Sequence, residues 1–243
     1  MVLFARRLLI ACSLALNALL AFGVLHFMRA EQALRIDPFE LDHWAADPLS
    51  PQPPAGLRRV IIFGDSRARQ WLKPTAADGF EFVNRGVGLQ TSAQVLGRFD
   101  RDLKRLSPSV VVLQLGVNDL KASATETASE QQILRRCQDN IAQLVQRSVG
   151  LGAHVVLSTI FSLGGLPWLR ALYIPSETSQ RVQYVNQFVR GLGSPHVSIL
   201  DTQRILDDVH GSVRSEYRSD FLHLNAAGYD ALNLELMKTL RAL

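Results

Sequence analysis

Val60-Ile61-Ile62-Phe63-Gly64-Asp65-Ser66 decides the fold, because four apolar residues run without a break into a glycine and two polar residues. Similar apolar runs cover residues 110–115, 154–160 and 197–200, and a shorter alternating run covers 80–83. Strands that are apolar on both faces are typical of a parallel sheet buried between helices. The sequence therefore predicts buried strands, the first of which ends at a turn that carries Ser66.

Segments with helical periodicity separate these runs. Apolar residues recur at helical spacing over residues 92–106, 126–149, 177–192 and 226–243. Strand and helix alternate along the chain, which predicts an α/β fold: a three-layer α/β/α sandwich, flavodoxin-like, with a mostly parallel sheet of about five strands. Many functions share this architecture, so the function must be argued from individual residues.

An apolar stretch without formal charge precedes the predicted domain at residues 8–28. As a helix rising about 1.5 Å per residue it would span about 30 Å, the thickness of the hydrocarbon core of a bilayer. Arg6 and Arg7 come just before it and predict a cytoplasmic N-terminus, a single-pass anchor in a bacterial inner membrane and a periplasmic domain. The alternative is a cleaved signal peptide and a secreted domain, although a small-residue cleavage pattern is missing.

Prolines crowd the segment that follows, at Pro38, Pro48, Pro51, Pro53 and Pro54. Proline at this density favours extended polyproline chain over packed structure. The expected division is therefore a cytoplasmic end at 1–7, a membrane helix at 8–28, a linker at 29–57 and a folded domain at 58–243.

Composition argues against several classes of protein. The 243 residues include 26 Lys and Arg and 22 Asp and Glu, a net charge of +4, and the basic residues are scattered. Nucleic-acid binding usually needs a concentrated basic stripe, so no nucleic-acid partner is expected. Two cysteines are too few for a disulfide framework or a zinc ribbon, and no metal site is expected.

Polar residues follow the predicted strands, at the edge where open α/β sheets bind ligands. A serine on a tight strand-to-helix turn suits a nucleophile, although Ser66 alone is equally explained as a helix cap. After the second strand, Gly86 and Gly88 allow close approach of the backbone to a ligand. After the third, the Asn118 amide can donate to a developing oxyanion or merely stabilise a turn.

Asp220 and His223 precede the last predicted helix. An aspartate three residues ahead of a histidine can turn back onto the imidazole and stabilise its protonated form. Each of these motifs is common by chance. All of them in this order, at strand exits or before the last helix, are much rarer.

This arrangement resembles the SGNH hydrolases, also called the GDSL family, over roughly residues 58–243. Longer strings carry the resemblance, namely Asn84-Arg85-Gly86-Val87-Gly88, residues 108–120 and, most specifically, residues 219–229. The resemblance implies a serine ester hydrolase that needs no metal or organic cofactor. It also implies that Ser66 is the nucleophile, that His223 takes its proton and that Asp220 orients His223.

The resemblance further implies an oxyanion hole made by the Ser66 N–H, an N–H of the glycine loop and the Asn118 side chain. Asp65 and Asp119 look like supports for the surrounding turns. Many relatives carry a second glycine where this chain has Leu89, so Leu89 is the alternative to Gly88 as the donor. That alternative requires Leu89 to adopt a suitable backbone conformation.

Two residues outside the motifs are candidates for substrate binding. Arg67 follows the nucleophile and either meets an anionic or sugar substrate or is simply solvated. Trp168, in the loop at 161–175, either stacks on a sugar ring or covers core.

The expected function is hydrolysis of acyl esters of small molecules or glycans, with short chains such as acetyl, because the short folded region leaves little room for an acyl tunnel. Three alternative hypotheses remain: an envelope polysaccharide O-acyltransferase with the same triad, a lysophospholipase or thioesterase, and a non-catalytic binding domain. The expected membrane contact is through the N-terminal helix, and the sequence does not indicate an oligomeric state.

Overall fold

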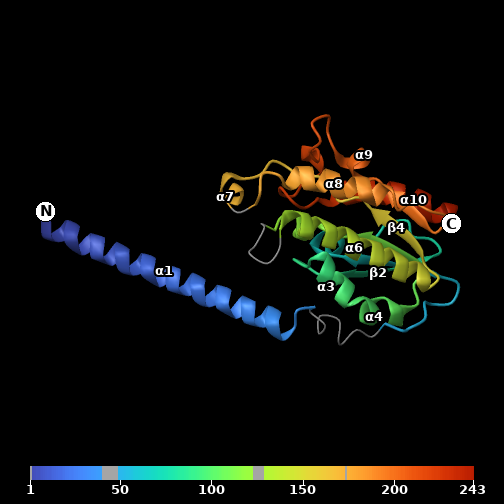
Figure 1. The fold of residues 1–243 in the computed structure, drawn as a ribbon, viewed down its shortest axis with the longest axis horizontal. Coiled ribbons are helices and arrows are strands. Elements are labelled where there is room, and N and C mark those ends of the chain that lie inside the picture. Colours follow the sequence, from blue (N-terminus) through green and yellow to red (C-terminus); the bar gives the residue numbers. More distant parts are fainter. Residues whose placement is uncertain (1, 40–48, 123–128, 173) are drawn as a thin grey trace. The chain divides into compact units, whose positions relative to one another are not determined.

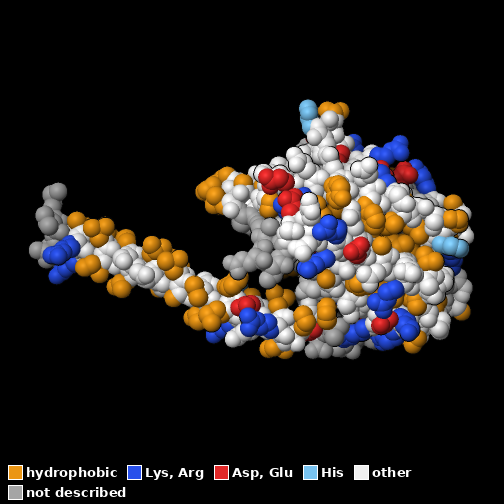
Figure 2. Space-filling model, viewed as in Figure 1, with side chains coloured by type: hydrophobic (Ala, Val, Ile, Leu, Met, Phe, Trp, Pro, Cys, Tyr) orange, Lys and Arg blue, Asp and Glu red, His pale blue; other side chains and the backbone are white. Residues whose placement is uncertain are grey.

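The computed structural model describes residues 2–39, 49–122, 129–172 and 174–243. The chain forms two compact units, Met1–Ala46 and Asp47–Leu243. The first contains helix α1 (Val2–Ile36), whose segment Phe4–Ile36 is long and apolar enough to cross a membrane by length and composition. Its best window has a mean hydropathy of 2.4, and none of that window is buried. Figure 2 shows hydrophobic side chains along most of this helix.

The predicted linker differs from the structure at both ends. Helix α1 continues to Ile36 rather than stopping at residue 28, because good helix formers fill this stretch and the first proline comes at Pro38. An ion pair of 2.7 Å between Glu31 and Arg35 adds to it. At the other end, the carbonyls of residues 50–52 accept hydrogen bonds from the buried Arg59 guanidinium. The last residues of the linker are therefore packed on the second unit, and residues 40–48 lie outside the described part.

Five parallel strands form the sheet of the second unit, in the order β2-β1-β3-β4-β5, which confirms the predicted fold class. The strands are β1 (Arg58–Gly64), β2 (Phe80–Gly86), β3 (Val110–Gln114), β4 (His154–Ser158) and β5 (Val197–Leu200). Gly64 pairs with Gly86 on one side and Gln114 on the other. The carboxyl ends of β2, β1 and β3 therefore lie level, and the loops that follow these strands meet at one edge of the sheet.

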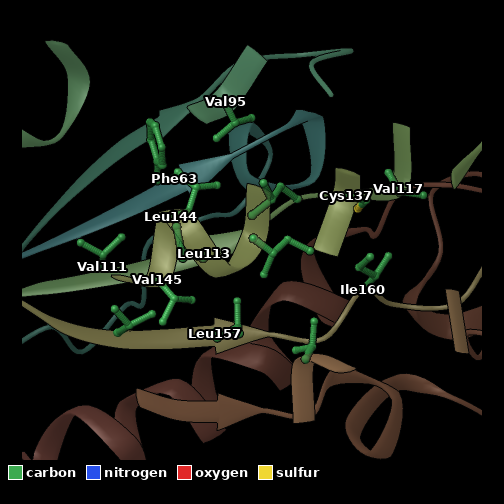
Figure 3. Packing of buried hydrophobic residues seen from close by; sticks show 14 of the residues in the cluster. Phe63, Val95, Val111, Leu113, Val117, Cys137, Leu144, Val145, Leu157 and Ile160 are labelled. Atoms are coloured by element: carbon green, nitrogen blue, oxygen red, sulfur yellow. The ribbon is translucent and has the colours of Figure 1, made fainter. Parts of the chain in front are cut away.

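Successive residues of each strand enter different cores, as the unbroken apolar runs predict. Ile61 and Phe63 pack on the side of the four helices α3 (Ser92–Gly97), α4 (Phe99–Asp102), α6 (Glu130–Gly150) and α8 (Thr178–Arg190). Figure 3 shows this cluster. Val60 and Ile62 pack on the other side, with residues of α9 (Thr202–Leu206) and α10 (Ala226–Ala242). The sheet is thus covered by helices on both faces (Figure 1).

The helix predicted at 92–106 is broken into α3, α4 and a short 3-10 turn at Lys104–Leu106. The break falls at Gly97-Arg98, where Arg98 leaves helical geometry and turns inward. Its guanidinium is buried and donates to the carbonyls of Gly64 and Arg85, at the ends of β1 and β2. The polar core contact explains the break, which apolar spacing could not reveal.

The other predicted helices agree with the structure within a few residues. Helix α6 begins at Glu130, after a capping box in which Ser129 and Gln132 satisfy each other's backbone N–H groups. The predicted start at 126–128 lies outside the described residues. The remaining short elements are α2 (Ser66–Arg69), α5 (Val117–Leu120), α7 (Trp168–Ala171) and a 3-10 turn at Ser215–Tyr217.

Candidate active site

A sharp turn after β1 presents Ser66 at the edge of the sheet. A Cβ on Gly64 would lie 1.7 Å from the Gln114 carbonyl oxygen, so only glycine lets this turn pack against β3. Asp65 caps α2 by accepting a hydrogen bond of 2.9 Å from the Arg67 N–H. Ser66 is therefore the first residue of α2 and is partly exposed.

The Ser66 hydroxyl meets the loop that carries Asp220 and His223. Ser66 Oγ lies 3.0 Å from His223 Nε2, and His223 Nδ1 lies 2.8 Å from Asp220 Oδ2. With the proton on Nδ1, the imidazole donates to the carboxylate and its Nε2 is free to accept from the hydroxyl. The structure thus joins the three residues that the sequence predicts from separate motifs.

Asp220 is held in one orientation by the turn it begins. Its other carboxylate oxygen, Oδ1, accepts from the backbone N–H groups of Leu222 at 2.6 Å and His223 at 2.8 Å. Partial burial opposes ionisation, but the hydrogen bonds from His223 and from these N–H groups outweigh it and lower the pKa of Asp220. Asp220 is therefore an anion throughout the neutral range and a fixed acceptor for the imidazole.

The loop after β2 is packed tightly against α2. A Cβ on Gly86 would lie 2.0 Å from the Arg69 backbone nitrogen, and the Asn84 side chain donates to the Ala68 carbonyl at 2.8 Å. The Asn118 amide donates to the Gln90 carbonyl at 2.9 Å. Asn118 therefore lies beside the glycine loop, as predicted, and one of its two N–H groups is committed to holding that loop.

Leu89 adopts a left-handed backbone conformation, with φ of 65°. This region favours glycine, and a leucine there carries a cost of about 1 kcal/mol. Its side chain is 81% exposed, so it stands above the loop and fills no core. Strain of this kind is typical of functional loops.

Asp119 supports the same loop from below. Its carboxylate accepts from the backbone N–H of Ser92 at 2.8 Å and from the Ser92 hydroxyl at 2.6 Å. Asn140 of α6 also donates to that hydroxyl, at 2.9 Å. Burial raises the pKa of Asp119, while the two bonds from Ser92 oppose the shift. Asp119 joins the exits of β2 and β3, in line with the supporting role expected of it.

Arg67 corrects both sequence-based expectations, because it is 0% exposed and neither solvated nor open to substrate. Its Nε donates to the Leu222 carbonyl at 3.0 Å, and its Nη1 donates to the Phe161 carbonyl at 2.7 Å. The guanidinium carbon lies 4.1 Å from the centre of the Phe161 ring. Arg67 therefore ties the nucleophile turn to the residue before His223 and to the loop after β4.

Burial shifts the ionisation of both charged neighbours of Ser66. Complete burial raises the pKa of Asp65 to about 6, against the attraction of Arg67. Burial lowers the pKa of Arg67 to about 10, partly offset by Asp65. Within the described chain, one oxygen of Asp65 and one nitrogen of Arg67 are buried without a hydrogen-bond partner. Burying these two charges therefore costs free energy, and the hydrogen bonds that Asp65 and Arg67 do form stabilise the turn at Ser66.

Trp168 lies on α7 and is 75% exposed, so the interpretation that it covers core is wrong. Figure 2 shows hydrophobic side chains gathered over α7. The loop that carries α7 contacts the triad loop, because the Gly164 N–H donates to the Phe221 carbonyl at 2.8 Å. The guanidinium of Arg170 also lies 5.8 Å from the Phe221 ring centre. The loop is therefore a neighbour of the candidate site, with an exposed aromatic side chain.

Sequence reasoning missed one polar contact of the turn. The buried Tyr229 hydroxyl donates to the Arg67 carbonyl at 2.8 Å and so fastens α10 to α2. Tyr229 closes the string at 219–229 that resembles the family, which was the available signal. Its apolar ring and its place on the stripe of a helix made it look like an ordinary core residue.

Comparisons with known proteins agree with this architecture. The family profile described as GDSL-like Lipase/Acylhydrolase family matches residues 51–231. No curated protein matches the sequence. Among solved structures, a GDSL-like lipase from Bacteroides thetaiotaomicron is 22% identical, with a TM-score of 0.70, and the match covers 84% of this chain and 99% of that one.

Two further solved structures show the same fold at lower similarity. A lipase/acylhydrolase from Enterococcus faecalis is 17% identical, with a TM-score of 0.59, covering 76% of this chain and 96% of that one. An acetylxylan esterase from Geobacillus stearothermophilus is 16% identical, with a TM-score of 0.58, covering 74% and 93%.

Proposed function

The chain belongs to the GDSL-like lipase/acylhydrolase family of carboxylic ester hydrolases, and from this premise we propose that it cleaves short acyl esters with Ser66, His223 and Asp220 as its catalytic triad. One observation carries the proposal: the unbroken hydrogen-bonded path from Ser66 Oγ through both ring nitrogens of His223 to Asp220. A structural histidine would not need its second nitrogen directed at a serine on a turn this constrained.

The first half-reaction is transfer of the acyl group to Ser66. As the Ser66 oxygen attacks the ester carbonyl carbon, its proton passes to His223 Nε2. Asp220 stabilises the imidazolium that forms. His223 then returns this proton to the departing alcohol oxygen as the ester C–O bond breaks, leaving an acyl-serine.

The second half-reaction returns the enzyme to its starting state. A water molecule gives a proton to His223 and attacks the acyl-serine carbonyl carbon. The Ser66 oxygen leaves and regains the proton from His223, and the carboxylic acid is released. If a sugar hydroxyl takes the place of water, the same steps transfer the acyl group.

We assign the oxyanion hole to the N–H of Ser66, the N–H of Leu89 and the second N–H of the Asn118 amide. Leu89 is preferred to Gly88 because its left-handed backbone is the strained point of the loop. The bond from Asn118 to the Gln90 carbonyl supports this choice, because it holds the amide beside Leu89.

The preference for a short acyl chain rests on the loop at Leu89. We infer that its exposed side chain, carried by a proposed oxyanion donor, limits the length of the acyl chain that can bind. The acetylxylan esterase among the fold relatives has a substrate of this kind, an acetyl ester of a glycan.

The test is hydrolysis of p-nitrophenyl esters of increasing chain length by the full chain in a nonionic detergent. We expect the highest kcat/KM for acetate and loss of turnover in Ser66→Ala, at unchanged thermal stability. Turnover that survives in Ser66→Ala would contradict the triad. Adding acetylated and free sugars then compares release of acetate with transfer to a sugar hydroxyl.

We also propose that α1 anchors the chain in a bacterial inner membrane, with the catalytic unit in the periplasm. The apolar length of Phe4–Ile36 and the two arginines near its start support this orientation. Mass spectrometry of the protein extracted from the membrane fraction tests the anchor. An intact N-terminal peptide is expected, whereas a chain that begins after residue 28 and fractionates as soluble would identify a cleaved signal peptide.

A further inference from the structure

Four basic side chains surround the proposed triad and play no part in the mechanism. They come from separate segments that leave the carboxyl edge of the sheet, and we call them the basic track: Arg69, Lys121, Arg170 and Arg218. Each of them has a position fixed by contacts or by its place on an element that holds a proposed catalytic residue.

Arg69 ends α2 and lies one helical turn after Ser66, so the two share a helix face. Its backbone is fixed by the close packing of Gly86. Its Nη1 lies 3.5 Å from the point where a Cβ on Gly88 would stand. The exposed guanidinium therefore lies on the glycine loop, beside the proposed oxyanion donor.

Lys121 lies three residues after Asn118, just as Arg69 lies three residues after Ser66. It comes one turn after Asn118 and is half-buried. Partial burial lowers the pKa of Lys121; the positive charges of Arg67 and Arg170 add to this effect, and the negative charges of Asp65 and Asp220 oppose it. The Lys121 ammonium group is therefore close enough to the charged groups of the candidate site to attract an anionic ligand there.

Arg218 and Arg170 lie on the other side of the triad. Arg218 packs on the loop after β4, since a Cβ on Gly164 would lie 2.6 Å from its Cδ and 2.7 Å from its Nη1. Arg170 approaches the ring of Phe221, two residues before His223. Both cations therefore border the triad loop.

The nearby acidic groups of the described chain form hydrogen bonds elsewhere than at Arg69, Lys121 and Arg218. Asp65 and Asp119 are buried beneath it, and Asp220 is bound to His223. Asp208 is close enough to Arg218 to feel its charge, but its carboxylate is bound to backbone N–H groups. Within the described residues, neither Arg69, Lys121 nor Arg218 forms an ion pair.

The basic track extends along the sheet edge rather than around one point. Arg69 follows β1, Lys121 follows β3, and Arg170 and Arg218 lie in or against the loop after β4, so the sheet order β1-β3-β4 separates the outer positions by two strand spacings, about 10 Å. A single charged headgroup would reach only part of this distance. A polymer with a charge on successive units would meet the whole track, and the exposed Trp168 beside it offers a face on which a sugar ring can stack.

We propose that the substrate is an O-acylated acidic glycan, whose carboxylates bind the basic track while one of its acyl esters lies at Ser66. The proposal rests on the esterase function proposed above and names its substrate class. Arginine pairs with carboxylates in a planar, two-bonded geometry, which favours uronic acids over neutral sugars. The charges bind the glycan and take no part in bond breaking.

The experiment compares kcat/KM of the full chain on acetylated polygalacturonate and on acetylated xylan of equal acetyl content. We expect a preference for the acidic polymer of about tenfold at low salt, falling toward unity at roughly 0.3 M NaCl. In Arg69→Gln/Lys121→Gln the ratio of the two values should fall about fivefold. The matched control is Arg58→Gln/Arg241→Gln, which removes the same charge near the opposite edge of the sheet, where Arg58 and the C-terminal Leu243 line a shallow cavity.

Equal kcat/KM on the two polymers, or a ratio that neither salt nor Arg69→Gln/Lys121→Gln changes, would overturn the proposal. A higher kcat/KM on lysophosphatidylglycerol than on either polymer would contradict a glycan substrate and indicate an anionic lipid instead. Turnover of p-nitrophenyl acetate by the same preparation separates these results from failure of the esterase function itself. A preparation that does not turn over this neutral ester contradicts the proposed function rather than the substrate class.

Discussion

Arg67 and Arg69 lie two residues apart in α2, yet they belong to two different regions of the molecule. The Arg67 side chain is fully buried and donates to backbone carbonyls of two loops. The Arg69 side chain is exposed and lies on the glycine loop. The buried region, with Asp65 and Asp119, fixes where the loops stand. The exposed region, with Trp168 and Arg69, faces solvent, where a substrate can reach it.

The role of a charged residue beside a nucleophile depends on whether its side chain is buried. A buried cation must satisfy most of its donors within the protein, because each donor left unpaired costs free energy. Such a residue becomes part of the scaffold. An exposed cation keeps its donors for water or for a ligand, so its removal should change specificity more than folding.

The largest effect, on kcat, is expected from removing the charge of Asp220, which is hydrogen-bonded to His223. Asp220→Asn should lower kcat by about 10³- to 10⁴-fold, because an amide no longer holds the Nδ1–H tautomer or stabilises the imidazolium. The measurement is steady-state hydrolysis of p-nitrophenyl acetate. The control is Asp230→Asn, an acid-to-amide change on α10, which should leave kcat within twofold. A similar loss in both variants would contradict a specific role for Asp220.

The next effect is on stability and separates the two arginines. Arg67→Met should lower the free energy of unfolding by about 3 kcal/mol, because the Leu222 and Phe161 carbonyls lose their donor. Arg69→Met, the matched change in the same helix, should stay within about 0.5 kcal/mol. Urea unfolding of both variants checks this. Equal losses would remove the distinction between the two regions.

Arg67 also has a positioning role that stability alone does not report. We expect Arg67→Met, measured where it is still folded, to lower kcat more than it raises KM, and Arg67→Lys to recover part of kcat. Recovery of stability without recovery of kcat would show that Arg67 supports the fold but does not position the triad loop.

Asp65 gives the buried region a pH dependence. Its pKa is raised to about 6, so the folded chain holds a proton that the unfolded chain releases near pH 4. As pH rises from about 4 to about 6, the native chain should lose up to about 3 kcal/mol relative to Asp65→Asn, which keeps the helix cap but cannot ionise. Urea unfolding of both proteins at pH 4 and pH 7 measures the difference, and a pH-independent difference would contradict the burial of this charge.

The smallest effect is expected at the strained leucine above the site. Leu89→Gly should raise the free energy of unfolding by up to about 1 kcal/mol, because glycine adopts the left-handed backbone without steric strain, and the greater freedom of glycine in the unfolded chain offsets part of this gain. It should also raise kcat/KM for longer p-nitrophenyl acyl esters relative to acetate. Leu172→Gly, at an equally exposed leucine with ordinary backbone, should bring neither gain. A loss of stability in Leu89→Gly would contradict the strain.

The sequence sufficed for the strands and for the meeting of Ser66 with His223. Unbroken apolar runs report burial on both faces, and parallel strands bring their carboxyl ends to one edge whatever the loops contain. It did not suffice for Arg67, because a charged side chain reads as exposed unless its acceptors are known. Those acceptors are backbone carbonyls more than 90 residues away, which no local pattern encodes.

The break at Arg98 and the packing of residues 50–52 were missed for the same reason. Both depend on a guanidinium that reaches carbonyls in other segments. Leu89 differs, since the sequence pointed to its backbone as the uncertain point of the loop, but only the structure shows that this backbone is left-handed.

The most direct test of the account is covalent labelling of the full chain with a fluorophosphonate, located by mass spectrometry. We predict a single modified residue, Ser66, with labelling that is abolished in Ser66→Ala and at least a hundredfold slower in Asp220→Asn. A folded protein that remains unlabelled, or a label on another serine, would contradict the assignment of Ser66 as the nucleophile.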